Sequence, residues 1–513
     1  MNFYDLDPSE QRQRSLQRLF RYLRRYVAPY HPFYRRKFRE AGIDLSRLRN
    51  EDDLRRLPIT SKDELRNDAL AFILRPNVAG SPPPEGFDSA PLGRDKILKY
   101  VFQALLNRPR EYSHLVRQPT FREQVRRRAL MEWLPVHFHV STGTTGNPTP
   151  ATYTHFDLTR VLPELASLLI IPKVRDAQER YFDWTDRTMN VFPGAPHLAF
   201  FTPVLAKTAA GTSTFETFGG HVIPTERQIE IFAQGGFTTM TAVPSYLVHW
   251  LRTALDLKKK GTIGNLSQWQ RVVVGAEPLS EPLREHMRSL ALELGVPSRF
   301  HILQSLGMTE MKWAFVECSE QSGIHMNPRY YFWELLDPES RQPVPEGEPG
   351  VLVFTHIDWR GTALLRYWTG DLVKGGMRWQ RCAACGYTFP LVFPPIVRAE
   401  KDFTKLKGAR VDLSDLIEAV RDARGVRLFQ ATLENEQPDD PFSRDVLAIR
   451  IVAEPGVAPS DIEQDVSRRV KQYTEVSPDR IVFEPNEEAL RQRLFQRTGI
   501  KAEYVVESRD SHI

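Results

Sequence analysis

The stretch that decides the fold is Ser141-Thr-Gly-Thr-Thr-Gly-Asn-Pro148, which follows a short run at residues 136–140. Its glycines allow the backbone to approach a phosphate group closely, and its hydroxyl side chains can donate hydrogen bonds to phosphate oxygens. The P-loop of nucleoside triphosphatases is excluded, because no Lys-Ser/Thr pair follows Gly146. The stretch predicts a phosphate-binding loop, although an ordinary Gly/Thr turn stays open on this segment alone. The residues of that loop are Ser141, Thr142, Gly143, Thr144, Thr145 and Gly146.

Downstream of this loop, short β-rich apolar runs alternate with helical patterns. The runs are at 189–192, 238–243, 269–275 and 300–303, and the helical patterns are at 226–233 and 281–294. Such alternation is typical of a mainly parallel α/β sheet. After Pro338, turn-separated strands at 350–356 and 363–368 predict a β-rich subdomain over about 338–400.

The C-terminal part has a different pattern. A helix at 413–424, paired strands at 426–434 and 446–454, a helix at 459–473 and a strand near Ile481 predict a small α+β domain. We therefore expect an α/β protein with a large domain at 1–400 and a small one at 401–513. Apolar spacing within residues 10–42 predicts amphipathic helices, and a Pro-rich break opens an insertion of unknown role at about 79–129.

Composition limits the classes of function. Across 513 residues, 69 Lys plus Arg against 64 Asp plus Glu leave a net charge of +5, which excludes polyanion binding through bulk charge. The 41% of apolar residues can bury a large core and exclude whole-chain disorder. No apolar run approaches the roughly 18 residues of a membrane span, and three cysteines cannot form a disulfide framework. We expect a cytoplasmic protein.

Four further motif-like segments follow the phosphate loop along the sequence. They are Gly275-Ala-Glu-Pro-Leu279, Leu306-Gly-Met-Thr-Glu310, Arg366-Tyr-Trp-Thr-Gly-Asp371 and Lys407-Gly-Ala-Arg-Val411. Together with the phosphate loop, this order resembles the acyl-adenylate-forming superfamily over nearly the whole chain. Longer segments narrow the resemblance to phenylacetate-CoA ligase and related aryl-acid CoA ligases: residues 31–43, 57–65, 153–154, 225–228, 243–246 and 317–325.

The resemblance implies an ATP-dependent ligase that adenylates an aromatic or aryl-alkanoic carboxylic acid and transfers the acyl group to coenzyme A. It implies that Thr309 contacts the α-phosphate and that Glu310 ligates magnesium. It also implies that Asp371 accepts hydrogen bonds from the ribose hydroxyls and that Lys501 stabilises the charge between the reacting carboxylate and phosphate. The remaining nucleotide-binding residues that it implies are Gly275, Ala276, Glu277, Leu306, Gly307, Met308 and Arg398. The acyl-pocket residues are Phe192, His197, Phe200, Val243, Pro244, Ser245 and Tyr246. Lys401 or Asp402 stands at the hinge between the domains.

The cysteines form a separate pattern. Cys382-Ala-Ala-Cys-Gly386 has the form of a zinc knuckle, in which two thiolates hold a tetrahedral ion and the glycine allows a tight turn. Cys318 and His325, separated by six residues, could complete a Cys3His set, and some members of the family hold structural zinc in a similar arrangement. Free buried thiols and a redox dithiol are the alternatives.

Several alternatives to this function stay open. The acyl acceptor could be an amine or a carrier-protein thiol, and a homodimer is one of the assemblies open to the chain. Leu306 replaces the family's usual aromatic residue, and Arg398-Ala399 replaces its usual Gly-Arg. Because of these departures, a non-catalytic nucleotide-binding protein on the same fold stays an alternative. Nucleic-acid binding through the N-terminal arginines is a further alternative, which the overall charge does not favour.

Overall fold

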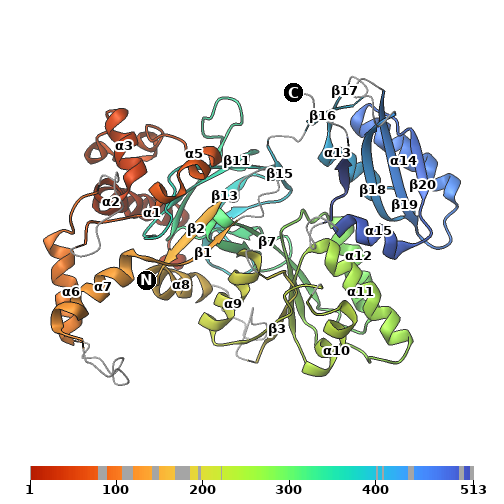
Figure 1. Ribbon diagram of the computed structural model, residues 1–513, viewed down its shortest axis with the longest axis horizontal. Helices are drawn as coiled ribbons and strands as arrows, with labels where there is room; N and C mark the ends of the chain where they lie inside the picture. Colours follow the sequence, from red (N-terminus) through yellow and green to blue (C-terminus); the bar gives the residue numbers. More distant parts are fainter. Residues whose placement is uncertain are drawn as a thin grey trace. The chain divides into compact units, whose positions relative to one another are not determined.

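The chain forms two compact units, Met1–Val397 and Arg398–Ile513 (Figure 1). The computed structural model describes residues 2–78, 89–106, 119–140, 149–167, 185–194, 198–220, 222–399, 403–406, 409–436, 444–495 and 502–508. No helix within these ranges is both long enough and apolar enough to cross a bilayer.

Short helices form the N-terminal part of the first unit. Their bounds are η1 Phe3–Asp5, α1 Pro8–Tyr22, η2 Leu23–Val27, α2 Ala28–Tyr30, α3 Pro32–Glu40, η3 Leu45–Arg47, α4 Glu51–Leu54, α5 Lys62–Asn67 and η4 Ala69–Phe72. Local sequence sets their starts: Asp7 caps α1 with Pro8 in its first turn, and Ser61 and Glu64 form a capping box on α5. His31 caps α3 and also contacts the carbonyl of Ala363 at 2.9 Å, which ties these helices to the β-rich region.

A six-stranded sheet carries the parallel α/β pattern. Its order is β4 (Ser213–Glu216), β3 (Arg187–Asn190), β5 (Thr239–Ala242), β6 (Arg271–Val274), β7 (His301–Met308) and β8 (Trp313–Val316). All neighbouring pairs are parallel except β7 and β8. Every residue of β5 and β6 is buried, as expected for strands that are covered on both faces.

Helices cover both faces of this sheet. A core that includes Met240, Trp250, Trp269 and Ile302 joins it to α10 (Thr225–Gly235), α11 (Pro244–Lys259) and α12 (Glu281–Glu293). Helix α9 (Leu198–Ala210) contacts α8 (Leu162–Ser167), β4, β7 and β8. The predicted α/β class is thereby confirmed.

The β-rich region includes strands from Ile324 onward, earlier than the predicted boundary. One sheet has the order β10 (Tyr331–Leu336), β11 (Gly350–His356), β12 (Tyr367–Val373) and β15 (Ile396–Arg398). A second has the order β13 (Met377–Arg381), β14 (Thr388–Val392) and β9 (Ile324–His325). The predicted strand at 363–368 is wrong for residues 363–366, because Arg366 has a φ of 44° and donates its backbone N–H to the Thr355 hydroxyl, and β12 begins at Tyr367.

The described residues of the second unit form a four-stranded sheet, a two-stranded hairpin and three helices. The strand order is β20 (Arg480–Phe483), β19 (Asp445–Ala453), β18 (Val426–Asn435) and β21 (Val505–Glu507). Helices α13 (Leu413–Arg421) and α14 (Pro459–Thr474) share a buried core with this sheet that includes Leu416, Ile449 and Val466. A separate hairpin joins β16 (Phe403–Leu406) to β17 (Ala409–Asp412), and α15 (Glu487–Phe495) follows β20. The sequence pattern predicted neither α15 nor β21.

Candidate active site

The predicted binding residues follow the carboxyl ends of neighbouring parallel strands. Phe192 follows β3, Val243 follows β5, Gly275 follows β6, and Met308 ends β7. These four strands are consecutive in the sheet, so the segments lie along one edge of it. In α/β sheets this edge is where ligands bind.

A carboxylate joins two of these segments. Glu277 accepts hydrogen bonds from the Ser245 backbone N–H at 3.0 Å and from the Ser245 hydroxyl at 2.9 Å. Ser245 lies in the first turn of α11, where unpaired N–H groups and the helix dipole favour a negative charge. The predicted acyl-pocket segment at 243–246 and the predicted adenine segment at 275–277 therefore form one connected surface.

Two glycines at this edge leave no room for a side chain. A Cβ on Gly275 would lie 2.3 Å from the Ser305 Oγ. A Cβ on Gly307 would lie 2.7 Å from the Ala314 Cβ and 3.0 Å from the Ala314 Cα. Both glycines let β7 pack closely against its neighbouring strands.

Three tyrosines hold the turn that carries Thr309 and Glu310. Tyr367 donates its hydroxyl hydrogen to Glu310 Oε1 at 3.1 Å, and Tyr331 donates to the carbonyl of Met311 at 2.7 Å. Tyr153, on β2 (Pro150–Thr154), donates to the carbonyl of Lys312 at 2.9 Å. Glu310 is thus a buried carboxylate in a fixed position.

Lys62 is a neighbour of Glu310 that sequence reasoning missed. Its Nζ lies 3.8 Å from Glu310 Oε1, and its side chain is partly exposed. The signal was present, because Lys62 lies within the segment 57–65 that resembles the aryl-acid CoA ligases. Nothing local, however, connects a residue in α5 with a turn almost 250 positions later.

A buried ion pair lies beneath this turn. The Lys312 Nζ is 3.3 Å from Asp157 Oδ2, and both side chains are fully buried. Lys312 adopts a left-handed φ of 66° and places its Nζ 4.1 Å from the Trp359 ring centre and 4.7 Å from that of Tyr153. Burial lowers the pKa of Lys312 to about 8, although the Asp157 charge opposes that shift.

Asp157 organises the backbone around the ion pair. Its Oδ2 accepts hydrogen bonds from the N–H groups of Thr154 at 3.1 Å and Gly361 at 2.8 Å, and its Oδ1 accepts one from the N–H of Arg360 at 2.9 Å. The carboxylate therefore links the strand after the phosphate loop to the loop between β11 and β12. Neither Asp157 nor Lys312 was predicted as a site residue.

Aromatic rings gather around α9, where the acyl pocket was predicted. The rings of Phe200 and Phe218 stack with their centres 4.9 Å apart. Phe201 stacks on His137, a residue that the sequence did not single out, at 4.2 Å. At the α11 end, the Tyr246 hydroxyl lies 3.1 Å from the Thr225 hydroxyl. These contacts describe a surface of flat, apolar side chains.

Several predicted site residues fall outside the described ranges. These are the phosphate-loop residues Ser141, Thr142, Gly143, Thr144, Thr145 and Gly146, together with His197, Lys401, Asp402 and Lys501. The phosphate-loop segment joins two paired antiparallel strands, β1 (Pro135–Val140) and β2. Asp371 is half-buried on β12, the strand whose Tyr367 contacts Glu310, and Arg398 ends β15 exposed.

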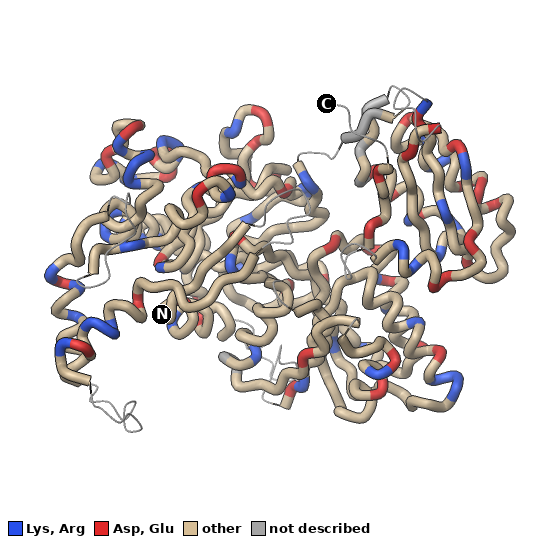
Figure 2. Tube along the Cα trace, viewed as in Figure 1, with Lys and Arg blue, Asp and Glu red and all other residues tan. Residues whose placement is uncertain are grey.

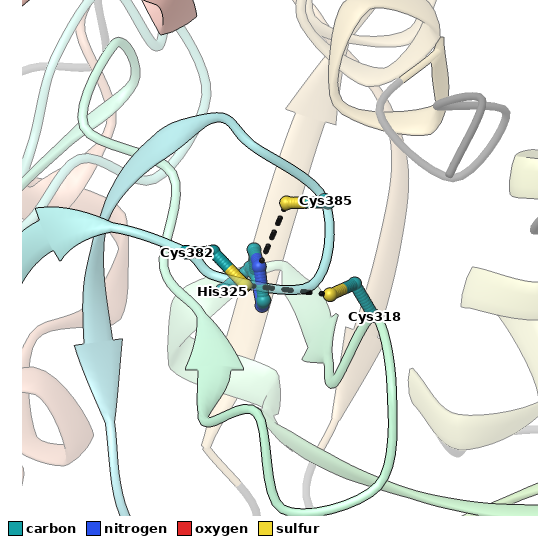
Figure 3. Close-up of side chains that lie close together, drawn as sticks. All are labelled: Cys318, His325, Cys382 and Cys385. Atoms are coloured by element: carbon teal, nitrogen blue, oxygen red, sulfur yellow. Dashed lines mark hydrogen bonds between the residues drawn. The ribbon is translucent and has the colours of Figure 1, made fainter. Parts of the chain in front are cut away.

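The predicted zinc-ligand set is brought together. Cys318, His325, Cys382 and Cys385 place their ligand atoms within 4.8 Å of one another (Figure 3). The sulfurs of Cys318 and Cys382 are 3.6 Å apart, and the Cys385 sulfur lies 3.4 Å from His325 Nε2. Cys318 follows β8, His325 lies on β9, and the two other cysteines occupy the turn between β13 and β14.

Hydrogen bonds prepare this cluster for a cation. His325 Nδ1 lies 2.9 Å from the carbonyl of Gly323, a contact that requires a proton on Nδ1 and leaves the Nε2 lone pair free for a metal. Hydrogen bonds with the Cys318 and Cys385 thiols lower the pKa of Cys382, which favours its thiolate. Gly386, with a φ of 74°, permits the turn and donates its N–H to the carbonyl of Cys382 at 2.9 Å.

Comparisons with known proteins agree with this arrangement. Residues 108–358 match the family described as AMP-binding enzyme. Over this stretch the chain is therefore similar to an AMP-binding domain of the acyl-adenylate-forming superfamily.

Two curated relatives point to a narrower group within these proteins. A protein of Thermus thermophilus named phenylacetate-coenzyme A ligase is 29% identical over 389 residues, which cover 75% of this chain and 70% of that protein. A Pseudomonas putida protein of the same name is 24% identical, with coverage of 84% and 77%. A solved 2-hydroxyisobutyryl-CoA ligase in its postadenylation state matches with a TM-score of 0.69 and 18% identity over 98% of this chain and 91% of that one. This last likeness shows the shared fold.

Proposed function

We propose that the protein is an AMP-forming acid–CoA ligase that adenylates an aromatic or aryl-alkanoic carboxylic acid. The observation that carries this proposal is the gathering of segments 243–246, 275–277 and 306–310 along the carboxyl edge of one parallel sheet. The relatives named phenylacetate-coenzyme A ligase support an aryl-alkanoic acid as the substrate and coenzyme A as the acyl acceptor. The aromatic side chains around Phe200 support a flat acyl group rather than a long chain.

The reaction has two steps. A carboxylate oxygen of the acid attacks the α-phosphorus of ATP, the bond to the β-phosphate oxygen breaks, and pyrophosphate leaves. The thiolate of coenzyme A then attacks the acyl carbonyl, and AMP leaves. Both steps bring anions together, so the site has to position them and offset their charge.

This chain's own residues divide those tasks. The hydroxyls of the loop at 141–146 hold the leaving phosphates, Thr309 contacts the α-phosphate, and the Asp371 carboxylate accepts hydrogen bonds from the ribose hydroxyls. Glu310 would supply an oxygen ligand for magnesium, and the ion would offset phosphate charge when it is bound. The buried carboxylate, fixed by Tyr367, fits such a hard cation.

The second unit supplies the mobile part of the mechanism. Lys501 stabilises the charge between carboxylate and phosphate during adenylation. The unit rotates about Lys401 or Asp402 between the two steps, as lids in multistep enzymes do. Separate cores in the two units support a rotation of this kind.

A structural zinc ion completes the proposed composition. Tetrahedral coordination with Zn–S bonds of about 2.3 Å sets neighbouring sulfurs about 3.8 Å apart. The separation of 3.6 Å between Cys318 and Cys382 fits this geometry. Four protein ligands leave no open position, so the ion would hold β9 and the β13–β14 turn against the end of β8.

A cytoplasmic location and a homodimer stay predictions.

Acid-dependent exchange of labelled pyrophosphate into ATP tests the first step. Benzoates, phenylacetates, aminobenzoates and fatty acids form the panel, and we expect exchange with an aromatic acid. Glu310→Gln should abolish exchange, and Glu339→Gln, which changes an exposed glutamate in the β10–β11 loop, should not. Exchange at the wild-type rate in Glu310→Gln would refute the assignment.

Release of AMP tests the acceptor. With the active acid present, coenzyme A should trigger stoichiometric AMP release and a thioester product. Exchange that occurs without thioester formation would point to an amine or a carrier-protein thiol. Nucleotide binding without exchange for any acid would favour the non-catalytic alternative.

A further inference from the structure

The described part of the insertion predicted at about 79–129 contains two packed helices, here called the hairpin, with an apolar face that no described residue covers. Helix α6 (Arg94–Leu106) packs along α7 (Phe121–Trp133) within the first unit (Figure 1). Leu98, Phe102, Leu105 and Leu106 of α6 are each 60–68% exposed. At 3.6 residues per turn, these four side chains fall within an arc of about 100°.

The opposite face of α6 is firmly attached to the rest of the unit. Tyr100 is buried and donates its hydroxyl hydrogen to Glu132 Oε2 at 2.9 Å, while Trp133 donates its Nε1–H to the Tyr100 hydroxyl at 2.8 Å. Glu132 also pairs with Lys99 at 2.7 Å and with the buried Arg360 at 3.1 Å. The hairpin is thus held in place through a buried polar network, and its apolar arc points away from that network.

Basic side chains surround the apolar arc. The two helices carry seven Lys and Arg residues against three Asp and Glu residues, so they account for most of the chain's net charge of +5 (Figure 2). By helical position, Arg94 borders the arc on one side, and Lys99, whose ammonium group is paired with Glu132, lies on the other. Arg122 and Arg126 on α7 are exposed, as is Arg25 on η2, whose carbonyl accepts a hydrogen bond from Lys96.

We propose that this hairpin docks the protein on the surface of a bilayer that contains anionic phospholipids. An exposed arc of leucine and phenylalanine bordered by Lys and Arg is the pattern of helices that lie in the membrane interface. The apolar arc enters the boundary between headgroups and acyl chains, and the flanking cations contact the phosphates. No span is involved, since α6 at 13 residues is only about 20 Å long.

Charge argues against two other occupants. A second copy of the chain would bring two basic faces together, and the resulting repulsion opposes association. Nucleic acid would use the cations but would leave the leucines and phenylalanine in water. An anionic bilayer satisfies both kinds of side chain at once.

Vesicle co-sedimentation of the full-length protein tests the proposal. We compare vesicles of phosphatidylcholine alone with vesicles in which about one third of the lipid is phosphatidylglycerol. Wild-type protein should sediment with the anionic vesicles, and the bound fraction should fall as salt increases from about 0.1 M to about 0.5 M. The assay contains no ATP and no acid, so its outcome is independent of the proposed ligase activity.

Variants separate the apolar from the electrostatic contribution. Phe102→Gln/Leu106→Gln keeps helix-forming residues and should lower the partition coefficient at least about tenfold. Arg94→Gln/Arg122→Gln should lower it about tenfold on anionic vesicles only. Leu292→Gln, at a 45% exposed leucine on α12, is the matched control and should bind like wild type. Unchanged tryptophan emission in every variant verifies that the fold is intact.

Three outcomes would overturn the proposal. The first is no binding of the wild type to either kind of vesicle. The second is equal binding by Phe102→Gln/Leu106→Gln and the wild type. The third is a dimer in analytical ultracentrifugation that this double variant abolishes in the absence of lipid, which would make the arc a contact between two copies of the chain.

Discussion

Replacement of Asp157 by asparagine should destabilise the first unit strongly near neutral pH. The substitution removes the only carboxylate within 4 Å of the Lys312 ammonium among the ion pairs of the described residues. Lys312 then keeps only uncharged partners: the Thr362 carbonyl at 3.2 Å, the amide oxygen of the new asparagine and the faces of two aromatic rings. Breaking a buried ion pair by removal of one partner costs about 3–5 kcal/mol, and we expect a loss in that range.

The loss should shrink as the pH rises. Burial already lowers the pKa of Lys312 to about 8 in the folded protein, below the value of about 10.4 for an unfolded chain. Between these values the unfolded chain binds more protons, so this group's contribution to the free energy of unfolding rises with pH. Without Asp157 the folded-state pKa of Lys312 falls further. The variant therefore sheds the proton below pH 8, and the difference from wild type narrows over that window.

Tryptophan fluorescence during urea unfolding measures this effect in the right unit. All nine tryptophans lie between Trp133 and Trp379, so their emission reports on the first unit alone. Unfolding midpoints at several pH values between about 6 and 9 give the free-energy difference and its slope. Asp63→Asn, at an aspartate side chain that is 83% exposed, is the matched control and should shift stability by less than about 0.5 kcal/mol.

A second substitution tests the cause. Lys312→Met should recover part of the loss when it is combined with Asp157→Asn, because no unpaired charge then remains buried. A loss below about 1 kcal/mol in Asp157→Asn, or a loss that does not change with pH, would refute the assignment of a charged Lys312 in this pair.

Three further predictions concern other parts of the molecule. Cys385→Ser should reduce zinc, measured by atomic emission, from about one ion per chain to a small fraction, and retention of the full amount would contradict the site. Gly307→Ala should destabilise the first unit by about 1–3 kcal/mol, because the new methyl group would meet Ala314 at 2.7 Å. Gly264→Ala, with nothing within 4 Å, is its control in the same unfolding assay. Lys501→Ala should slow pyrophosphate exchange while it spares thioester formation from supplied acyl-adenylate, and equal effects on both steps would argue against its role.

Much of the fold could be predicted because its determinants are local. The strand predicted at 350–356 is β11, and the helix predicted at 459–473 differs from α14 by one residue. Both have clear periodicity and clear ends. The strand predicted from 363 failed because its apolar residues are buried in a loop, where the Ala363 N–H donates to the Phe72 carbonyl.

The candidate site was predictable only in part. Motif residues such as Glu277 and Glu310 were visible from their spacing and family resemblance. Their partners were not, because Tyr367 and Lys62 reach Glu310 from distant segments that carry no local signal of that contact. The pair of Asp157 and Lys312 spans 155 positions and depends entirely on tertiary packing.

The contact between Glu277 and Ser245 bears on attempts to redesign the enzyme for other acids. If residues 243–246 line the acyl pocket as proposed, they are targets for altering acid preference, but the first turn of α11 also supports Glu277 in the predicted adenine segment. A change of Ser245 that enlarges the proposed pocket removes one hydrogen bond from that carboxylate and loosens the segment predicted to line the adenine. Selection for a new acid at these positions will therefore alter the KM for ATP as well, and libraries should vary residue 277 together with residue 245.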